Sequence, residues 1–236
     1  MTNPNHHISR QPNILALDTA FGEIAACIIK GGQVYISPPD ARSAGKTRST
    51  SIIPTIHQLL LQAGLNWKQL DVLAFGAGPG SFTGLRIGAA TLAGMNAGLH
   101  MPVVHLSSLA ITARQVVTGL AEPGEPATEK AIYVLEDARA GEVFVGHYQN
   151  GRAMQPDACL SWQDVDAFTP ELFCCNSTPP VQLNHWQRLP LTIPRSRALA
   201  VEAEAVCSRV KELSCLPVYP APVYLQLSQA ERQANG

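Results

Sequence analysis

The sequence predicts an α/β fold with two lobes, and three observations support this. Short apolar segments at 13–20, 23–32 and 33–38, with glycines at the turns between them, form an antiparallel strand meander. Helix-like and strand-like segments then alternate, which is typical of an α/β sheet. A segment rich in proline and glycine follows at 119–130, so a second α/β lobe begins there.

Apolar spacing predicts the elements that follow the meander. The segment 51–65 has a helical apolar stripe, and Gly64 is placed to end that helix. The stripe consists of Ile52, Ile56, Leu59, Leu60 and Ala63. The next elements are expected to be a strand at 71–78, a helix at 85–100, a strand at 101–106 and a helix at 107–117. Ser107 or Ser108 would cap the last helix.

The second lobe is less regular. A strand, a turn and a second strand are expected over 131–151, and a clear helix over 197–213. Between them, residues 150–197 have frequent prolines and poor periodicity. The predicted division is a disordered leader at 1–12, an N-terminal lobe at 13–118, a second lobe at 119–215 and an extended tail at 216–236.

Composition limits the classes of function. The 236 residues are 46% hydrophobic, and 17 basic side chains stand against 18 acidic ones. No excess positive charge is left to neutralise a long nucleic acid, so a partner would have to hold any RNA. The six cysteines form no CxxC pair, and no apolar run approaches the roughly 20 residues that span a bilayer. We therefore expect a reduced cytoplasmic protein without a metal or cofactor of its own.

The stretch GAGPGSFTGLRIG, residues 76–88, fails three tests of spacing. It lacks the lysine of a P-loop, and Ser81 and Thr83 stand where a dinucleotide fingerprint has its third glycine. A nucleophile elbow needs GxSxG, but Pro79 occupies the first glycine position. Ser81 is therefore a weak candidate nucleophile.

A helix cap is the simpler role for this stretch. The hydroxyl of Ser81 or Thr83 could accept hydrogen bonds from the first unpaired amides of the next helix. The same amides can also bind an anion, so phosphate binding near residues 81–85 remains an alternative.

The helix that follows is rich in small residues. Ala90, Gly94 and Gly98 are spaced by four, and glycines at 88, 94 and 98 would together cost about 2 kcal/mol. Small residues at this spacing let two backbones approach closely. Another stripe of the helix consists of Ile87, Thr91 and Met95. Together with Leu85 and Leu92, this stripe forms more apolar surface than one sheet can cover. We therefore expect part of this helix to contact another chain.

Four segments of the sequence are distinctive: ILALDTA near the start, GAGPGSFTGLRIG in the middle, DARAGEVF at 137–144 and PVYL at 222–225. In order and spacing they resemble the bacterial TsaB family, also called YeaZ. The resemblance implies the two-lobed fold of the actin, sugar kinase and Hsp70 group (the ASKHA fold), with a reduced C-terminal lobe.

The resemblance also implies a function in a complex. Members of the family are non-catalytic subunits in the synthesis of N6-threonylcarbamoyladenosine (t6A) at position 37 of transfer RNAs that read ANN codons. Their partners are a paralogue, TsaD, which carries the metal and transfers the threonylcarbamoyl group, and an ATPase, TsaE. A homodimer is possible when the subunit is alone, and tRNA would be reached only through the complex.

The family's contact with TsaD uses its first two helices, which correspond here to about 48–63 and 81–98. The resemblance and the small-residue helix together predict these interface residues: Ile52, Ile56, Gly84, Leu85, Ile87, Gly88, Thr91, Leu92 and Met95.

The sequence departs from its relatives at two points. The family commonly has an acid and a histidine before the first helix, where this chain has Thr47 and Arg48. Nucleotide-binding relatives of the fold use an acid at the end of the first strand to help hold Mg²⁺, and Asp18 takes that place. The flanking TAFGE lacks a second glycine to admit phosphates, so Asp18 is expected mainly to cap a turn.

An enzyme is the alternative hypothesis, either an ASKHA-type phosphotransferase or a peptidase. A kinase would need a second glycine loop in the C-terminal lobe, and DARAGEVF has one glycine. A peptidase would need a metal site or a triad, and the histidines are scattered. A direct RNA-binding module is opposed by the neutral charge.

Overall fold

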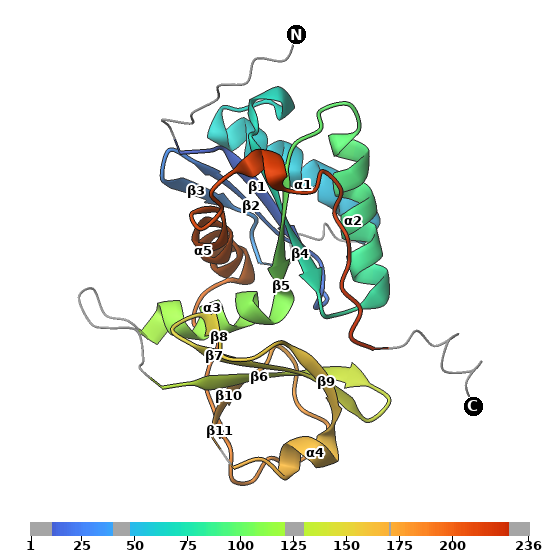
Figure 1. Cartoon of the computed structure of the whole chain (residues 1–236), viewed down its shortest axis with the longest axis vertical. Coiled ribbons are helices and arrows are strands. Elements are labelled where there is room, and N and C mark those ends of the chain that lie inside the picture. The colour runs from blue at the N-terminus through green and yellow to red at the C-terminus, as the bar shows by residue number, and fades with distance from the viewer. Residues whose placement is uncertain (1–10, 40–47, 121–129, 170, 227–236) are drawn as a thin grey trace.

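The computed structural model describes residues 11–39, 48–120, 130–169 and 171–226, and it contains two β-sheets. Figure 1 shows the first sheet above the second, with α3 between them. The first sheet has five strands in the order β3-β2-β1-β4-β5, and the second has six. The mixed α/β architecture in two lobes is as predicted.

The first sheet begins with the predicted meander. Strands β1 (Ile14–Asp18), β2 (Ala25–Lys30) and β3 (Gln33–Ile36) pair antiparallel to one another. Strand β4 (Val72–Gly78) then pairs parallel to β1, and β5 (Val103–Ser107) pairs parallel to β4. Because helices connect the parallel strands, the apolar residues on both faces of this sheet become buried.

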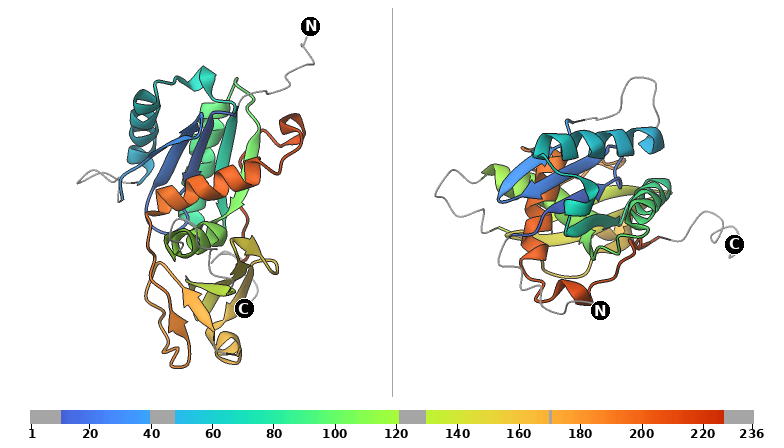
Figure 2. Two further views of the ribbon diagram at one scale, coloured as in Figure 1. Left: turned by 90° about the vertical axis from the view of Figure 1, so that its left-hand side faces the viewer. Right: turned by 90° about the horizontal axis from the view of Figure 1, so that it is seen from above.

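Helices cover the two faces of the first sheet differently. Helices α1 (Arg48–Ala63) and α2 (Phe82–Asn96) pack with one apolar cluster, and α5 (Arg195–Cys207) packs with the cluster on the other side. Figure 2 shows α5 in front of the sheet in its left-hand view. A short 3-10 helix, η1 (Trp67–Gln69), precedes β4 and is capped by the side chain of Asn66.

The second sheet is built around one hairpin. Strands β6 (Ile132–Arg139) and β7 (Glu142–Gln149) pair antiparallel, as the segment 131–151 predicts. One face of this sheet packs against α3 (Ser108–Leu120). The remaining elements are β8 (Arg152–Ala153), β9 (Ala158–Ser161), α4 (Trp162–Asp166), β10 (Leu172–Cys174) and β11 (Gln187–Arg188). They are too short to give a periodic signal, which is why residues 150–197 carried no prediction.

Helix α5 corrects the predicted division into lobes. The sequence analysis places residues 197–213 in the second lobe as a helix. The helix instead runs from Arg195 to Cys207 and packs against β1, β2 and β5 of the first sheet, with the 3-10 helix η2 (Leu213–Cys215) after it. Its small apolar residues fit against small residues of the strands, such as Ala16 and Cys27. The chain therefore leaves the second sheet before about residue 195.

The tail is extended, as predicted, over the described residues 216–226. The carbonyl of Pro217 accepts a hydrogen bond from the N–H of Val103 (2.7 Å), and the N–H of Val223 donates to the carbonyl of Ala77 (2.7 Å). The tail therefore runs along the first sheet, from the amino end of β5 to the carboxyl end of β4 (Figure 1). The predicted leader, apart from residues 11 and 12, and most of the predicted connection at 119–130 lie outside the described residues.

Candidate functional site

The glycines of residues 76–88 admit other parts of the backbone. A Cβ atom at Gly78, where φ is +114°, would lie 2.7 Å from the carbonyl oxygen of Val223 in the tail. A Cβ atom at Gly80 would lie 2.6 Å from the Cβ atom of Ala20, in the turn after β1. Both approaches are closer than a side chain allows, so these glycines bring the tail and the β1–β2 turn against the start of α2.

Ser81 caps α2. Its Oγ accepts a hydrogen bond from the N–H of Gly84 (3.3 Å), which confirms one of the two predicted caps. Thr83 lies inside the first turn and is exposed, so it is not the cap. The carbonyl of Gly84 in turn accepts a hydrogen bond from Thr19 Oγ1 (2.7 Å), which fixes α2 to the end of β1.

A cleft of about 1170 Å³ lies between the lobes, where α2 begins. Residues of the β1–β2 turn and of the first turn of α2 form one wall, and residues of the β6–β7 hairpin and the segment after β10 form the other. The tail contributes Val223, Tyr224, Leu225 and Gln226. The cleft therefore brings together segments from the two lobes and the chain's end.

An aromatic pair at this cleft attaches the tail to α2. The rings of Phe82 and Tyr224 lie 4.9 Å apart, and the guanidinium of Arg86 lies 3.7 Å from the centre of the Phe82 ring. Arg86 Nε also donates a hydrogen bond to Tyr224 Oη (3.4 Å). Sequence analysis missed this cluster, because its members are 138 residues apart.

Asp18 forms a buried ion pair beneath the cleft. Arg195 Nε donates to Asp18 Oδ2 (2.6 Å), and the pair is almost completely buried. The other carboxylate oxygen accepts from Ser108 Oγ and from the N–H of Ala20, both at 3.1 Å. The contact with Ala20 confirms the predicted turn cap, but the ion pair with Arg195 was not foreseen, because the two residues are 177 positions apart.

These contacts test whether the site fits the Mg²⁺ that nucleotide-binding relatives of the fold hold. A metal ligand must offer a free oxygen lone pair to the cation, and Asp18 directs Oδ2 to the Arg195 guanidinium. Within the part of the chain that the structure describes, no three His, Cys, Asp or Glu side chains are grouped to bind a metal. With the Arg195 guanidinium bound to Asp18, this site does not fit a divalent cation.

Glu136 carries the charged network into the second lobe. Its Oε1 accepts a hydrogen bond from the N–H of Asn176 (2.9 Å), and the Asn176 side chain donates to Thr112 Oγ1 (3.0 Å). Thr112 also accepts from Arg195 Nη1 (2.8 Å). Burial raises the pKa of the Glu136 carboxyl above its ordinary value, and the hydrogen bonds from Asn176 and the charge of Arg195 oppose that rise.

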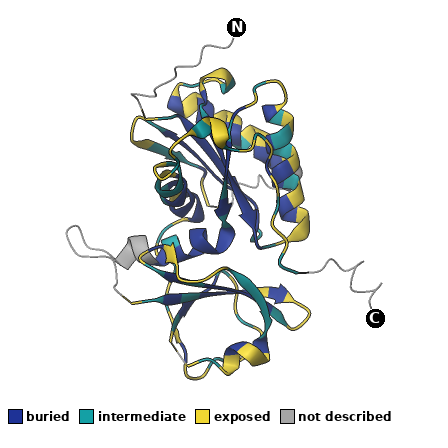
Figure 3. Ribbon diagram, viewed as in Figure 1, coloured by how far each residue is buried: buried dark blue, intermediate teal, exposed yellow. Residues whose placement is uncertain are grey.

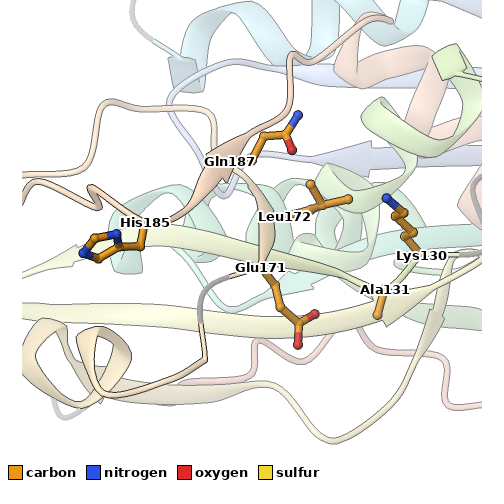
Figure 4. Close-up of a pocket in the computed structure, with 6 residues that line it drawn as sticks. All are labelled: Lys130, Ala131, Glu171, Leu172, His185 and Gln187. Carbon is orange, nitrogen blue, oxygen red and sulfur yellow. The ribbon is translucent and has the colours of Figure 1, made fainter.

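A second hollow, of about 420 Å³, lies at the edge of the second sheet. Lys130, Glu171 and His185 contribute its charged or ionisable side chains, and all three are exposed. Figure 4 shows His185 and Lys130 at opposite ends of this hollow, with the Glu171 carboxylate pointing away from both. Because these groups do not converge, the hollow is a weaker candidate than the interlobe cleft.

Most of the predicted interface residues are buried within the chain, so that part of the prediction is wrong. Six of the nine pack inside the first lobe: Ile52, Ile56, Gly84, Leu85, Gly88 and Leu92. The physical reason is the helical period, which places Ile52 and Ile56 on the same side of α1 as Leu59, Leu60 and Ala63, facing the sheet. The other three, Ile87, Thr91 and Met95, are half-buried.

Other residues of the same two helices are exposed. Ile53 and Leu61 of α1 are 53% and 61% exposed, and Ala90 and Gly94 of α2 are exposed as well. We call these four residues the uncovered face. Figure 3 shows the exposed outward sides of α1 and α2 beside the buried strands. Ile53 and Leu61 are apolar residues of α1 that lie outside the predicted stripe, and this sequence signal could have identified them as exposed apolar residues.

Of the glycines of α2, Gly88 faces the sheet and Gly94 faces outward. A Cβ atom at Gly88 would lie 2.6 Å from Thr19 Oγ1, whereas one at Gly94 would meet no atom within 4 Å. Gly98 follows the end of the helix with φ +86°, so it terminates α2 and is not inside it as predicted. The close packing of α2 on its own sheet thus accounts for Gly88 but not for Gly94.

Comparisons with known proteins agree with this architecture. The family model for TsaD, tRNA N6-adenosine threonylcarbamoyltransferase, matches residues 38–169, more than half of the chain. The tRNA threonylcarbamoyladenosine biosynthesis protein TsaB of Haemophilus influenzae is 33% identical over 132 residues, which are 56% of this chain and 51% of the relative. TsaB of Escherichia coli is 31% identical over 138 residues, 58% of this chain and 54% of the relative. The chain thus matches about half of the length of these relatives.

Solved structures show the same fold. YeaZ from Pseudomonas aeruginosa has a TM-score of 0.70 at 23% identity, with 91% of this chain and all of that chain covered. A second Pseudomonas aeruginosa structure, described as similar to the peptidase YeaZ, also has a TM-score of 0.70, at 24% identity. The chain therefore has the fold of these YeaZ structures, and it belongs to the family that the TsaD model, tRNA N6-adenosine threonylcarbamoyltransferase, describes.

Proposed function

We propose that this chain is a non-catalytic subunit of a cytoplasmic complex that installs t6A at position 37 of tRNAs reading ANN codons. A TsaD-like paralogue would be its direct partner, a TsaE-like ATPase would join the pair, and tRNA would be bound only through the complex. The names of its relatives, which are tRNA threonylcarbamoyladenosine biosynthesis proteins, support the pathway. No described helix is long and apolar enough to cross a membrane.

The uncovered face carries the partner role. Ile53 and Leu61 expose large apolar side chains on the outer side of α1, and the exposed small residues of α2 lie on the same side of the sheet. Exposed apolar surface of this kind is typical of a contact with another protein. At Gly94 a second backbone could approach α2 without meeting a side chain of this chain.

The ion pair beneath the cleft supports a role without catalysis. Asp18 is engaged by Arg195, and Ser81 caps α2 through its Oγ atom. The Asp18 carboxylate is then not available as a metal ligand, and the hydrogen bond described for Ser81 joins its hydroxyl to a backbone amide, which is not a base that could activate it. Metal and ATP are expected on the partner subunits.

Reconstitution of the modification reaction tests the proposal. The TsaD-like protein, the TsaE-like ATPase and the threonylcarbamoyl-AMP synthase of the same organism are mixed with unmodified tRNA, with and without this chain. We expect t6A to form only in its presence, and the chain to co-elute with the TsaD-like protein in size-exclusion chromatography. Full activity without this chain, and no co-elution, would overturn the proposal.

A phosphotransferase is the second candidate, because a cleft of about 1170 Å³ is large enough for a nucleotide. ATP hydrolysis or phosphate transfer by the purified chain alone, lost on Asp18→Asn, would favour it. The ion pair of Asp18 with Arg195 opposes it.

A further inference from the structure

Three oxygen atoms from two elements surround the guanidinium of Arg195. They are Asp18 Oδ2 at 2.6 Å, the carbonyl oxygen of Ser108 at 2.8 Å and Thr112 Oγ1 at 2.8 Å. Carboxylate, carbonyl and hydroxyl oxygens are also the ligands that hard divalent cations prefer. The guanidinium therefore occupies a set of oxygens that would suit a metal ion.

This charged cluster is separated from the cleft. The ring of Phe21 lines the cleft, and its centre lies 5.0 Å from the central carbon of the guanidinium. Asp18, Ser108, Thr112 and Arg195 are buried and do not line the cleft. A ligand in the cleft would therefore meet Phe21 and the start of α2, and not the Asp18 carboxylate.

We propose that Arg195 is a built-in cation that takes the place of the divalent metal of nucleotide-binding relatives, so that any ligand of the interlobe cleft binds without a metal ion. Arg195 lies on α5, which packs on the first sheet but follows the strands of the second sheet in the sequence. Through Thr112 and Asn176 the same guanidinium is connected to Glu136 on β6. The side chains that join the lobes at this point are thus held by a permanent positive charge.

Metal titration of two arginine variants tests this assignment. Arg195→Ala empties the oxygen set. Arg114→Ala instead removes a largely buried ion pair between Arg114 of α3 and Glu202 of α5, and it leaves Asp18 untouched. Thermal unfolding midpoints are measured with EDTA, with magnesium chloride and with calcium chloride. We expect the wild type and Arg114→Ala to be unaffected by either metal. Arg195→Ala should gain about 3 °C or more in saturating metal, and Asp18→Asn in that background should abolish the gain.

Two results would overturn the assignment. One is a folded Arg195→Ala protein that responds to the metals no more than Arg114→Ala does. The other is magnesium-dependent binding of a fluorescent ATP analogue by the wild type, which would decide the question even if Arg195→Ala fails to fold. Neither measurement needs a partner protein, so this inference can fail while the proposed role in t6A synthesis stands.

Discussion

The two faces of the first sheet are completed in different ways. On one face, α5 returns from the far end of the chain and places a charged side chain, Arg195, where it donates to three buried oxygen atoms. On the other, α1 and α2 bury one apolar stripe each and leave Ile53, Leu61 and Gly94 exposed. Both faces of the sheet are thus covered within the chain, but α1 and α2 also carry exposed apolar and small residues on the side away from the sheet, where we have proposed that a partner binds.

Breaking the ion pair between Asp18 and Arg195 should lower the free energy of unfolding more than any other change proposed below. Arg195→Met leaves Asp18 buried without a counter-charge, so we expect unfolding to become easier by about 3 to 5 kcal/mol. The double variant Asp18→Asn with Arg195→Met should be more stable than Arg195→Met alone, because no unpaired charge remains. Urea denaturation measures both. Equal losses in the single and double variants would show that the cost lies in packing and not in charge.

Gly88→Ala should destabilise the chain by about 1 to 3 kcal/mol. The added Cβ atom would lie 2.6 Å from Thr19 Oγ1, and Thr19 cannot retreat without losing its hydrogen bond to the carbonyl of Gly84. Urea denaturation of Gly88→Ala, and of Gly88→Ala combined with Thr19→Ala, which removes the oxygen that the new Cβ atom meets, provides the test. If Gly88→Ala is as stable as the wild type, α2 is not packed against the end of β1 as described.

The network around Arg195 also gives a pH dependence. Because burial raises the pKa of Glu136 in the folded chain, this residue contributes stability that is present below its unfolded pKa and is lost as the pH rises through the folded value. Glu136→Gln cannot ionise and can still accept from Asn176. We therefore expect the stability of Glu136→Gln relative to the wild type to increase as the pH rises above the ordinary pKa of a glutamate, about 4. A difference that stays constant, or falls, would contradict the raised pKa.

Gly94→Ala should stabilise the free chain slightly, whereas Gly88→Ala should destabilise it. The new Cβ atom meets no other group, and alanine is the better helix former, so the free chain should gain about 0.5 to 1 kcal/mol. If a partner backbone approaches α2 here, the same variant should bind the TsaD-like protein less tightly. Denaturation and isothermal titration calorimetry measure the two effects. A variant that is stabilised and pairs normally would remove Gly94 from the contact.

Local signals account for what could be predicted from the sequence. The strand meander, the β6–β7 hairpin and the cap of α2 by Ser81 depend on residues close together in the chain, where periodicity and turn chemistry are informative. The pairs Asp18–Arg195 and Arg86–Tyr224 join residues 177 and 138 positions apart, and no local pattern marks either. Nothing in one sequence indicates that α5 returns to the first sheet.

Part of the predicted interface was wrong for a more instructive reason. In α1 the apolar stripe was correctly identified, but two of its members, Ile52 and Ile56, were assigned to a partner although a sheet-covering helix must bury that stripe itself. The informative residues were the apolar ones off the stripe, Ile53 and Leu61. In α2 apolar and small residues occur on every side, so period alone does not decide which face is outward.

Leu61→Glu tests the central claim most directly. Leu61 is 61% exposed, so the variant should unfold within about 0.5 kcal/mol of the wild type, unlike changes at the half-buried Ile87 or Met95. Met154→Glu is the matched control, because Met154 is 55% exposed but lies beside β8 in the second lobe. The measurement is the affinity of each protein for the TsaD-like paralogue, by titration calorimetry. We expect Leu61→Glu to bind at least about ten times more weakly, and Met154→Glu to bind as the wild type does. Normal binding by Leu61→Glu, or an equal loss in both variants, would contradict the claim that the uncovered face of α1 and α2 receives the partner.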